Sequence, residues 1–297
     1  MMSSSFPPEG ATPSYCPAGW DLERLLNVGV TGDAASVTPK QWEVFREGFK
    51  ADKGEQAFEG FSDEMWRREK KAKGIETPIG EPQFMELMRI REQRVGPSAQ
   101  WDPWGFIIFK SPQIQNDREW QACKERFAAI IEDVIQRDRC REFPGAEECL
   151  SRMQFRWVED AGDQEGGFRS IARARANLEL PAGQNHSISL YITPSSLSSI
   201  LNSPLPSSAK RKWRKQIPFV VAVSAKAGEE IDDVAVAEDV AGADWRGYFN
   251  IAVESLVYSV FSMLADDSRS PFEMGGRVEG EDIWCDPYRG GIHRAET

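Results

Sequence analysis

Four stretches of the chain carry the hydrophobic patterns of β-strands. Residues 104–110 are an apolar run between two prolines, which is typical of a buried strand. Residues 153–158 and 187–193 alternate apolar with polar positions, as in strands with one solvated face. Residues 217–223 are a further apolar run, in which Pro218 must lie at a strand end or at an edge. The pattern therefore predicts four strands.

Apolar residues recur at the helical period between these strands. A long helix is expected to begin after Asn116 and to end before Pro144, and its apolar stripe consists of Trp120, Cys123, Phe127, Ile130, Ile131, Val134 and Ile135. A short arginine-rich helix over residues 168–178 and a final helix over residues 245–265 are also predicted. Further helix starts are expected before residue 100, because Pro39 and Pro82 each follow a capping or acidic residue.

This order of elements favours an α+β fold. We expect a four-stranded sheet with helices on one face, in ferredoxin-like order with insertions, together with an N-terminal helical extension. An α/β Rossmann-like, doubly wound sheet is the alternative, because spacing alone does not reveal which strands pair. The expected division is a disordered arm over residues 1–18, a helical extension over residues 19–100 and an α+β core domain over residues 101–297.

Composition and charge narrow the class of protein. The chain has 297 residues, of which 40% are hydrophobic, and this is too apolar for a mainly disordered protein. A net charge of -11 argues against nonspecific binding to DNA or to an anionic membrane, so a nucleic-acid partner would need a local basic patch. With no signal sequence or membrane span expected, and five cysteines that form no CxxC pair, we expect a cytoplasmic protein with reduced thiols.

Several kinds of catalytic site are disfavoured by residue type. His186 and His293 are the two histidines, each in or beside a loop, so a Ser-His-Asp or Cys-His site is a poor fit. A histidine-based metal site is disfavoured for the same reason, and the chain has no glycine-rich nucleotide-binding motif. Hydroxyls follow Thr193-Pro194 at a predicted strand-to-helix turn, where capping explains most such residues. We expect no cofactor and no metal.

A basic segment offers a candidate nucleic-acid contact. It places five cations beside Trp213 with no acid between them, an arrangement suited to phosphate contacts with an aromatic ring available for stacking. The alternative is a solvated helix end whose cations favour the C-terminal dipole. The five cations are Lys210, Arg211, Lys212, Arg214 and Lys215.

An acidic segment follows the last predicted strand. Residues 229–239 hold six carboxylates, among them Asp232, Asp233 and Glu238. Crowded carboxylates raise one another's pKa and can create a general acid or base. The alternative is a flexible acidic surface loop.

Short motifs along the second half of the chain resemble a group of fungal proteins. The matching stretches are residues 104–110, 155–160, 189–193, 213–221 and 245–250. Among proteins of this kind, the chain is most similar to the arginine-containing cyclodipeptide synthases. The resemblance implies a secondary-metabolism transferase that joins arginine and a second amino acid from two aminoacyl-tRNAs into a diketopiperazine.

The resemblance also implies where the site lies. The family carries an Asp-Asp-x-x-Glu motif, whose nearest match here is Asp232-Asp233 with Glu238, two residues further along than in the family. These three residues are the expected catalytic carboxylates, and the basic segment is the expected contact for arginyl-tRNA and the second aminoacyl-tRNA. A non-catalytic protein-binding or scaffold protein of ferredoxin-like fold is the alternative function, and a carboxylate-metal hydrolase is a weaker one.

Overall fold

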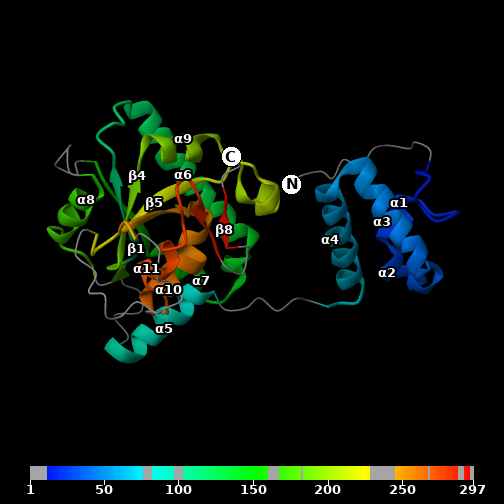
Figure 1. Ribbon diagram of the computed structural model, residues 1–297. Helices are drawn as coiled ribbons and strands as arrows, with labels where there is room; N and C mark the ends of the chain where they lie inside the picture. The colour runs from blue at the N-terminus through cyan, green and yellow to red at the C-terminus, as the bar shows by residue number, and fades with distance from the viewer. Residues whose placement is uncertain are drawn as a thin grey trace. The chain divides into compact units, whose positions relative to one another are not determined.

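The computed structural model describes residues 12–75, 82–96, 103–159, 167–181, 183–227, 245–266, 268–286 and 291–294. The chain divides into two compact units, Met1–Pro78 and Ile79–Thr297 (Figure 1). We describe each unit by itself.

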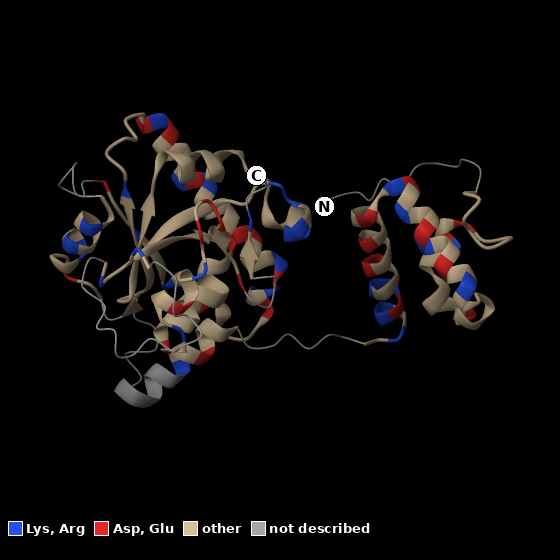
Figure 2. Cartoon of the chain, in the orientation of Figure 1, with Lys and Arg blue, Asp and Glu red and all other residues tan. Residues whose placement is uncertain are grey.

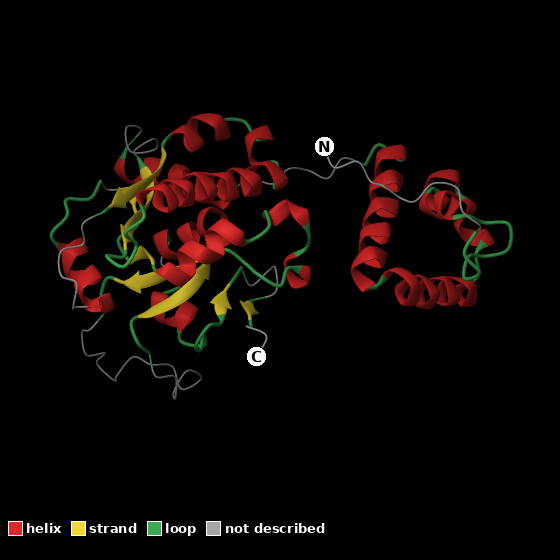
Figure 3. Ribbon diagram, turned by 90° about the horizontal axis from the view of Figure 1, so that it is seen from above, coloured by secondary structure: helices red, strands yellow, loops and turns green. Residues whose placement is uncertain are grey.

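The described part of the first unit is helical (Figure 3). Its elements are α1 (Leu22–Leu26), α2 (Val28–Thr31), the 3-10 turn η1 (Asp33–Ser36), α3 (Pro39–Lys53) and α4 (Glu55–Ala72). Thr38 and Gln41 form a reciprocal capping box that starts α3, with Pro39 in its first turn. Phe45, Phe49 and Phe61 pack together at the centre, with ring centroids 5.2 to 5.6 Å apart. The helical extension thus has a hydrophobic core of its own.

The first unit includes residues that the sequence pattern assigned to a disordered arm. The ring of Tyr15 lies 6.0 Å from that of Phe45, and its hydroxyl donates a hydrogen bond of 2.9 Å to Asp52. Burial raises the pKa of Tyr15, and the hydrogen bond with Asp52 raises it further. Residues 12–18 are therefore packed onto the helices, whereas residues 1–11 lie outside the described part of the chain.

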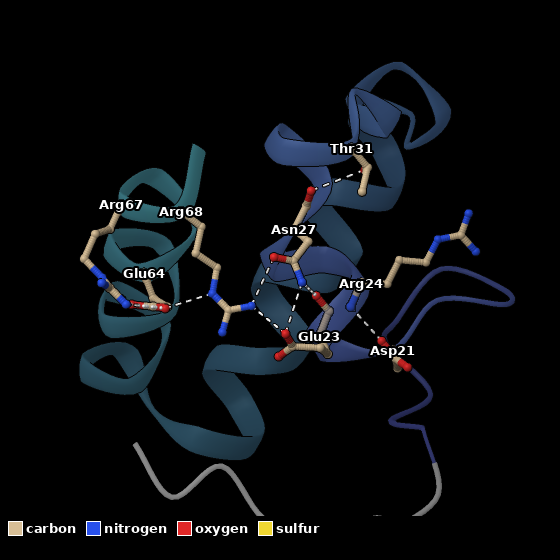
Figure 4. A network of polar contacts seen from close by, with 8 residues as sticks. All are labelled: Asp21, Glu23, Arg24, Asn27, Thr31, Glu64, Arg67 and Arg68. Carbon is tan, nitrogen blue, oxygen red and sulfur yellow. Dashed lines mark hydrogen bonds and ion pairs between the residues drawn. The ribbon is translucent and has the colours of Figure 1, made fainter. Parts of the chain in front are cut away.

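Arg67 and Arg68, in the basic second half of α4, both form ion pairs. Arg68 contacts Glu64 at 2.8 Å and, across to α1, Glu23 at 2.5 Å and Asn27 at 3.1 Å (Figure 4). Burial acts to raise the pKa of Glu64, but hydrogen bonds from Arg68 and Arg67 outweigh it and hold the pKa below its usual value. In Figure 2 the charged side chains in the first half of α4 are acidic and those in its last turns are mostly basic. This order complements the helix dipole. These arginines therefore stabilise α4 and its contact with α1.

The described part of the second unit is built on one mixed sheet of eight strands. The strands are β1 (Trp104–Lys110), β2 (Met153–Val158), β3 (Gly183–Gln184), β4 (Ile188–Ile192), β5 (Phe219–Ser224), β6 (Tyr248–Ala252), β7 (Ile283–Trp284) and β8 (Ile292–His293). Their order is β2-β1-β4-β5-β6-β7-β8, and β3 pairs with β1. All four predicted strands are present in this sheet.

The sheet corrects the predicted topology within the α+β class. β1 runs parallel to both β2 and β4, whereas β5 is antiparallel to its neighbours β4 and β6. The four-stranded, ferredoxin-like order is therefore wrong, and the parallel half follows the doubly wound pattern of the alternative. Three of the strands that the sequence pattern did not predict have two residues each, and so short a strand cannot show an alternating pattern.

Helices cover both faces of this sheet, not one. The long helix α6 (Asp117–Arg137) and α9 (Pro194–Asn202) pack on the face that carries Phe106, Leu190 and Val220. The helix α8 (Gly167–Ala176) lies on the opposite face, over Ile107 and Val221 (Figure 1). The buried residues of α6 are Trp120, Cys123, Phe127, Ile130, Ile131, Val134 and Ile135, the stripe expected from the sequence.

The predicted final helix begins as a strand. Residues 248–252 form β6, and helical turns follow as η8 (Val253–Ser255), the π-helical η9 (Leu256–Val260) and α10 (Phe261–Ala265). β6 has the burial pattern of a sheet interior, with β5 on one side and β7 on the other. Pairing with these strands outweighs the helical period that continues after it. Other short helices of the second unit are η3 (Cys140–Glu142), α7 (Ala146–Ser151), η4 (Pro206–Ser208), η5 (Arg211–Trp213) and α11 (Pro271–Gly275).

The helix α5 (Gln83–Val95) belongs with the sheet. Phe84 is fully buried, and its ring stacks on that of Trp104 at 5.3 Å. The indole of Trp104 in turn donates a hydrogen bond of 2.9 Å to the Cys149 carbonyl. The division between the two units therefore falls near residue 78, earlier than the expected boundary at residue 100.

Candidate functional site

The basic segment lines a cavity of about 510 Å³ in the second unit. Four separate parts of the chain form its walls: the end of α6, the turn η5, the turn η8 and strand β8. Four cations and two carboxylates line it, together with one histidine and one isoleucine. These residues are Arg137, Asp138, Lys210, Arg211, Lys212, Glu254, Ile292 and His293. Positive charge thus gathers in one concavity of a protein whose net charge is -11.

Hydrogen bonds to α6 hold the loop that carries the basic segment. Arg126 donates a bond of 2.7 Å to the Ser203 carbonyl. Asp133 accepts bonds from the main-chain nitrogen and the hydroxyl of Ser207, at 2.7 and 2.6 Å. Two anchor points therefore precede η5, whose single turn closes with a bond from the Trp213 nitrogen to the Lys210 carbonyl. The long helix positions the basic segment although the two are distant in sequence.

Arg214 is a structural member of the segment. Its side chain is 2% exposed, and its Nη2 atom lies 2.5 Å from Oε2 of Glu254, whose side chain is 5% exposed. A buried carboxylate without such a partner would carry a large desolvation cost. The pair joins the end of η5 to the turn that follows β6. Arg214, expected from the sequence to contact tRNA, is thus buried against Glu254.

Arg211 presents an unused donor at the cavity. Its Nη1 atom is buried and has no hydrogen-bond partner among the described residues. The Nε and Nη1 atoms of Arg214, a residue outside the cavity wall, also have no partner among the described residues. Buried donors of this kind cost free energy unless a group binds them, and guanidinium groups suit phosphate or carboxylate oxygens. The guanidinium of Arg211 therefore suits an anion.

Two titratable residues beside these cations have shifted pKa values. Burial raises the pKa of Asp138, while Arg137, whose Nε lies 3.2 Å from Oδ1, acts in the opposite direction. Burial lowers the pKa of His293, a hydrogen bond to the Lys215 main chain partly offsets this, and Arg211 lowers it further. His293 is therefore neutral at pH 7 and can donate one hydrogen bond and accept another.

The sequence-predicted site residues lie in different places. Lys210, Arg211 and Lys212 line the cavity, whereas Lys215 is exposed and is absent from the cavity wall. The expected catalytic residues Asp232, Asp233 and Glu238 lie outside the described residues. Lys212 also covers the ring of Trp213, with 4.9 Å between Nζ and the ring centroid, so one face of that ring is already occupied.

Sequence reasoning missed the other lining residues of the cavity, among them Arg137 and His293. Arg137 is the last residue of α6, and its place in the last turn of a long helix was the available signal. His293 comes from a two-residue strand beside β7, and no local pattern marks so short an element. The hydroxyl cluster after β4 has the expected capping role, because Thr193 and Ser196 form a capping box at the start of α9.

A second groove, of about 620 Å³, lies between the start of α6 and α9. It adjoins the carboxyl ends of the parallel strands β1 and β4, where the strand order reverses in the doubly wound part of the sheet. Amide side chains such as Gln113, Asn116 and Asn202 line it, next to Leu197 and Leu201. Its one charged residue, Glu119, is exposed. The groove therefore has fewer charged groups than the cavity at η5.

Neither a metal-binding cluster nor a membrane-spanning helix is present among the described residues. No group of three or more His, Cys, Asp or Glu side chains there could hold a metal ion. Within the same residues, none of the helices has the length and apolar character needed to cross a membrane.

No protein-family model matches the chain, and neither a curated protein nor a solved structure matches it. The likeness to the cyclodipeptide synthases therefore rests on the short sequence motifs alone.

Proposed function

We propose that the protein binds aminoacyl-tRNA through the cavity at η5 and acts as an aminoacyl-tRNA-dependent acyltransferase. The observation that carries the proposal is the gathering of Lys210, Arg211 and Lys212 in one concavity, joined by Arg137 from another element. Phosphate contacts by clustered cations supply most of the affinity in RNA binding, and a local cluster suffices in an acidic protein.

The finer form of the proposal is the cyclodipeptide synthase reaction. The amino group of one aminoacyl-tRNA attacks the ester carbonyl carbon of the other, a peptide bond forms, and the attacked ester bond breaks, which releases the 3′-hydroxyl of the attacked tRNA and leaves the dipeptide on the attacking one. A second, intramolecular attack closes the diketopiperazine ring and releases the second tRNA. Each step needs a group that accepts the amine proton and one that returns a proton to the leaving oxygen. We assign these roles to Asp232, Asp233 and Glu238, with arginine as one substrate.

Binding of tRNA tests the first part. In the triple variant Lys210→Ala, Arg211→Ala, Lys212→Ala, we expect tRNA affinity at moderate salt to fall and the slope of log K against log salt to shrink by about 2 to 3, because about three phosphate contacts are lost. Filter binding across a salt series measures both quantities. A control with Arg118→Ala, Arg152→Ala and Arg173→Ala removes three exposed cations from the same unit, away from the cavity wall. Equal loss in both triple variants would refute site-specific binding.

Product formation tests the second part. Expression in a bacterial host should release an arginine-containing diketopiperazine into the medium, detected by mass spectrometry. Asp233→Asn should lower its yield by about 100-fold, which is typical of losing a general base. Soluble, folded protein that yields no such product while still binding tRNA would favour the non-catalytic binding protein instead.

A further inference from the structure

The helix α4 has an exposed face opposite the one that packs into the core of the first unit. Phe61 is buried in that core, and Phe58 and Met65 pack against it. On the other side, positions that recur every three or four residues form what we call the α4 face. Its members are Gln56, Glu59, Gly60, Asp63, Trp66, Lys70 and the C-cap residue Lys73. Glu59 is half-buried and the others are exposed.

Trp66 lies in the middle of the α4 face and is 57% exposed. No other large hydrophobic side chain in the described part of the chain is more exposed. Tryptophan is enriched among the residues that supply most of the energy of protein–protein interfaces. Beside it, a Cβ atom added to Gly60 would have no neighbour within 4 Å, so another helix can approach closely there. The face therefore offers an apolar anchor on open ground.

The charges of the α4 face follow an order along the helix (Figure 2). Glu59 and Asp63 precede Trp66, whereas Lys70 and Lys73 follow it. Lys73 is paired with Glu69 of the same helix, and Lys70 forms no ion pair within the described residues. If the face meets a copy of itself with the helix direction reversed, its acidic part lies against the basic part of the copy, and each contact occurs twice. The face is therefore complementary to itself.

We propose that the α4 face binds the α4 face of a second copy of this chain, with the two helices antiparallel about a two-fold axis near Trp66. Each Asp63 then lies opposite Lys70 of the second copy, and the two indoles pack at the centre. The carboxylates of Glu59 and Asp63 disfavour a nucleic acid on the same face, because they repel its phosphates. This association concerns the first unit and goes beyond the proposed function, which concerns the cavity at η5.

Sedimentation equilibrium of the full chain over about 1–300 µM tests the association. One helix per copy, about 27 Å long, makes a small interface, so we expect a dissociation constant of about 1–100 µM. The dimer should weaken as salt is added, because exposed charge pairs are screened. Trp66→Ala should weaken it by at least about 30-fold, since both copies lose the anchor. Its affinity for tRNA should equal that of the parent protein.

Charge exchange tests the antiparallel pairing. Asp63→Lys and Lys70→Glu, each alone, should weaken the dimer by at least about 10-fold, because like charges then meet twice in the interface. An equimolar mixture of these two variants should associate about as well as the parent protein, since each altered position then faces an opposite charge. The control Lys40→Glu makes the same change at an exposed position of α3 and should leave the dimer unchanged.

Three results overturn the proposal. One is a chain that stays monomeric at every concentration, including a monomer whose RNA affinity falls in Lys70→Glu, which would assign the face to a nucleic acid. Another is a dimer that Trp66→Ala leaves unchanged, which would place the interface elsewhere. The third is a mixture of the two charge variants that fails to associate although circular dichroism shows both to be folded. Recovery in the mixture supports the proposal and shows at once that neither variant has unfolded.

Discussion

A single residue, Arg214, shows how position changes the meaning of a charge. In the sequence it is one of five similar cations, and in the structure it is buried and bonded to Glu254, while Arg211 three positions earlier faces the cavity. One arginine is thereby available to a ligand and the other holds the turn in place.

The buried pair leads to a prediction about stability. Arg214→Met leaves Glu254 buried without its partner, and we expect the free energy of unfolding to fall by about 3–5 kcal/mol. Glu254→Met should destabilise the protein in the same way. The double variant should be less destabilised than either single one, because no uncompensated charge remains in the interior.

Urea unfolding of the four proteins measures this cycle. Arg118→Ala, at an exposed position, should change the free energy of unfolding by less than about 0.5 kcal/mol. Additive losses in the double variant would mean that the two side chains contribute independently and that their pairing has no energetic weight.

Among the elements, β1 depends most on one glycine. Gly105 has φ +135°, and a Cβ atom there would lie 2.2 Å from the Gln154 carbonyl oxygen in β2. Both the backbone conformation and the close approach of the two strands exclude a side chain. The pairing between β1 and β2 therefore requires glycine at this position.

Gly105→Ala should destabilise the second unit by more than about 3 kcal/mol, since a strained conformation and a steric clash act together. Gly60→Ala makes the same chemical change within α4, where no atom lies within 4 Å of the added Cβ. It should stabilise the first unit by about 0.5–1 kcal/mol. Thermal unfolding of the variants measures both effects, and a tolerated Gly105→Ala would contradict the packing of β1 against β2.

The same elements show how far the sequence could predict the fold. The stripe of α6 and the four longer strands follow from local periodicity, and the structure contains them. The direction of pairing does not follow, because β1 and β4 meet across many intervening residues and either direction buries the same faces. The candidate site shows the same limit. Its basic segment is contiguous and was visible, whereas His293 reaches the cavity through a two-residue strand.

Across the whole molecule, thiol chemistry should report on both units. Cys16 is partly exposed in the first unit, and the other four cysteines are buried in the second. Burial raises the pKa of Cys123 and Cys149 to about 12 and that of Cys285 to about 11, so these thiols are protonated at pH 8.

Iodoacetamide at pH 8 should therefore modify Cys16 well before the other thiols, although burial also raises the pKa of Cys16. Peptide mass spectrometry of the alkylated protein measures the order. In urea all five cysteines should react at similar rates, which serves as the control. Early labelling of Cys123, on the buried stripe of α6, would contradict the packing of that helix on the sheet.

The position of β1 between β2 and β4 has a consequence for synthesis on the ribosome. β1 ends at Lys110, but its partners begin at Met153 and Ile188, so the strand is made well before either neighbour exists. At about 5–20 residues per second, the interval from Lys110 to the end of β4 at Ile192 is roughly 4–16 s. Until β2 is made, both edges of this buried, apolar strand are unpaired, and one edge stays unpaired until β4 follows, which exposes the nascent chain to aggregation. A chaperone that binds extended apolar segments would find its clearest target in residues 104–110.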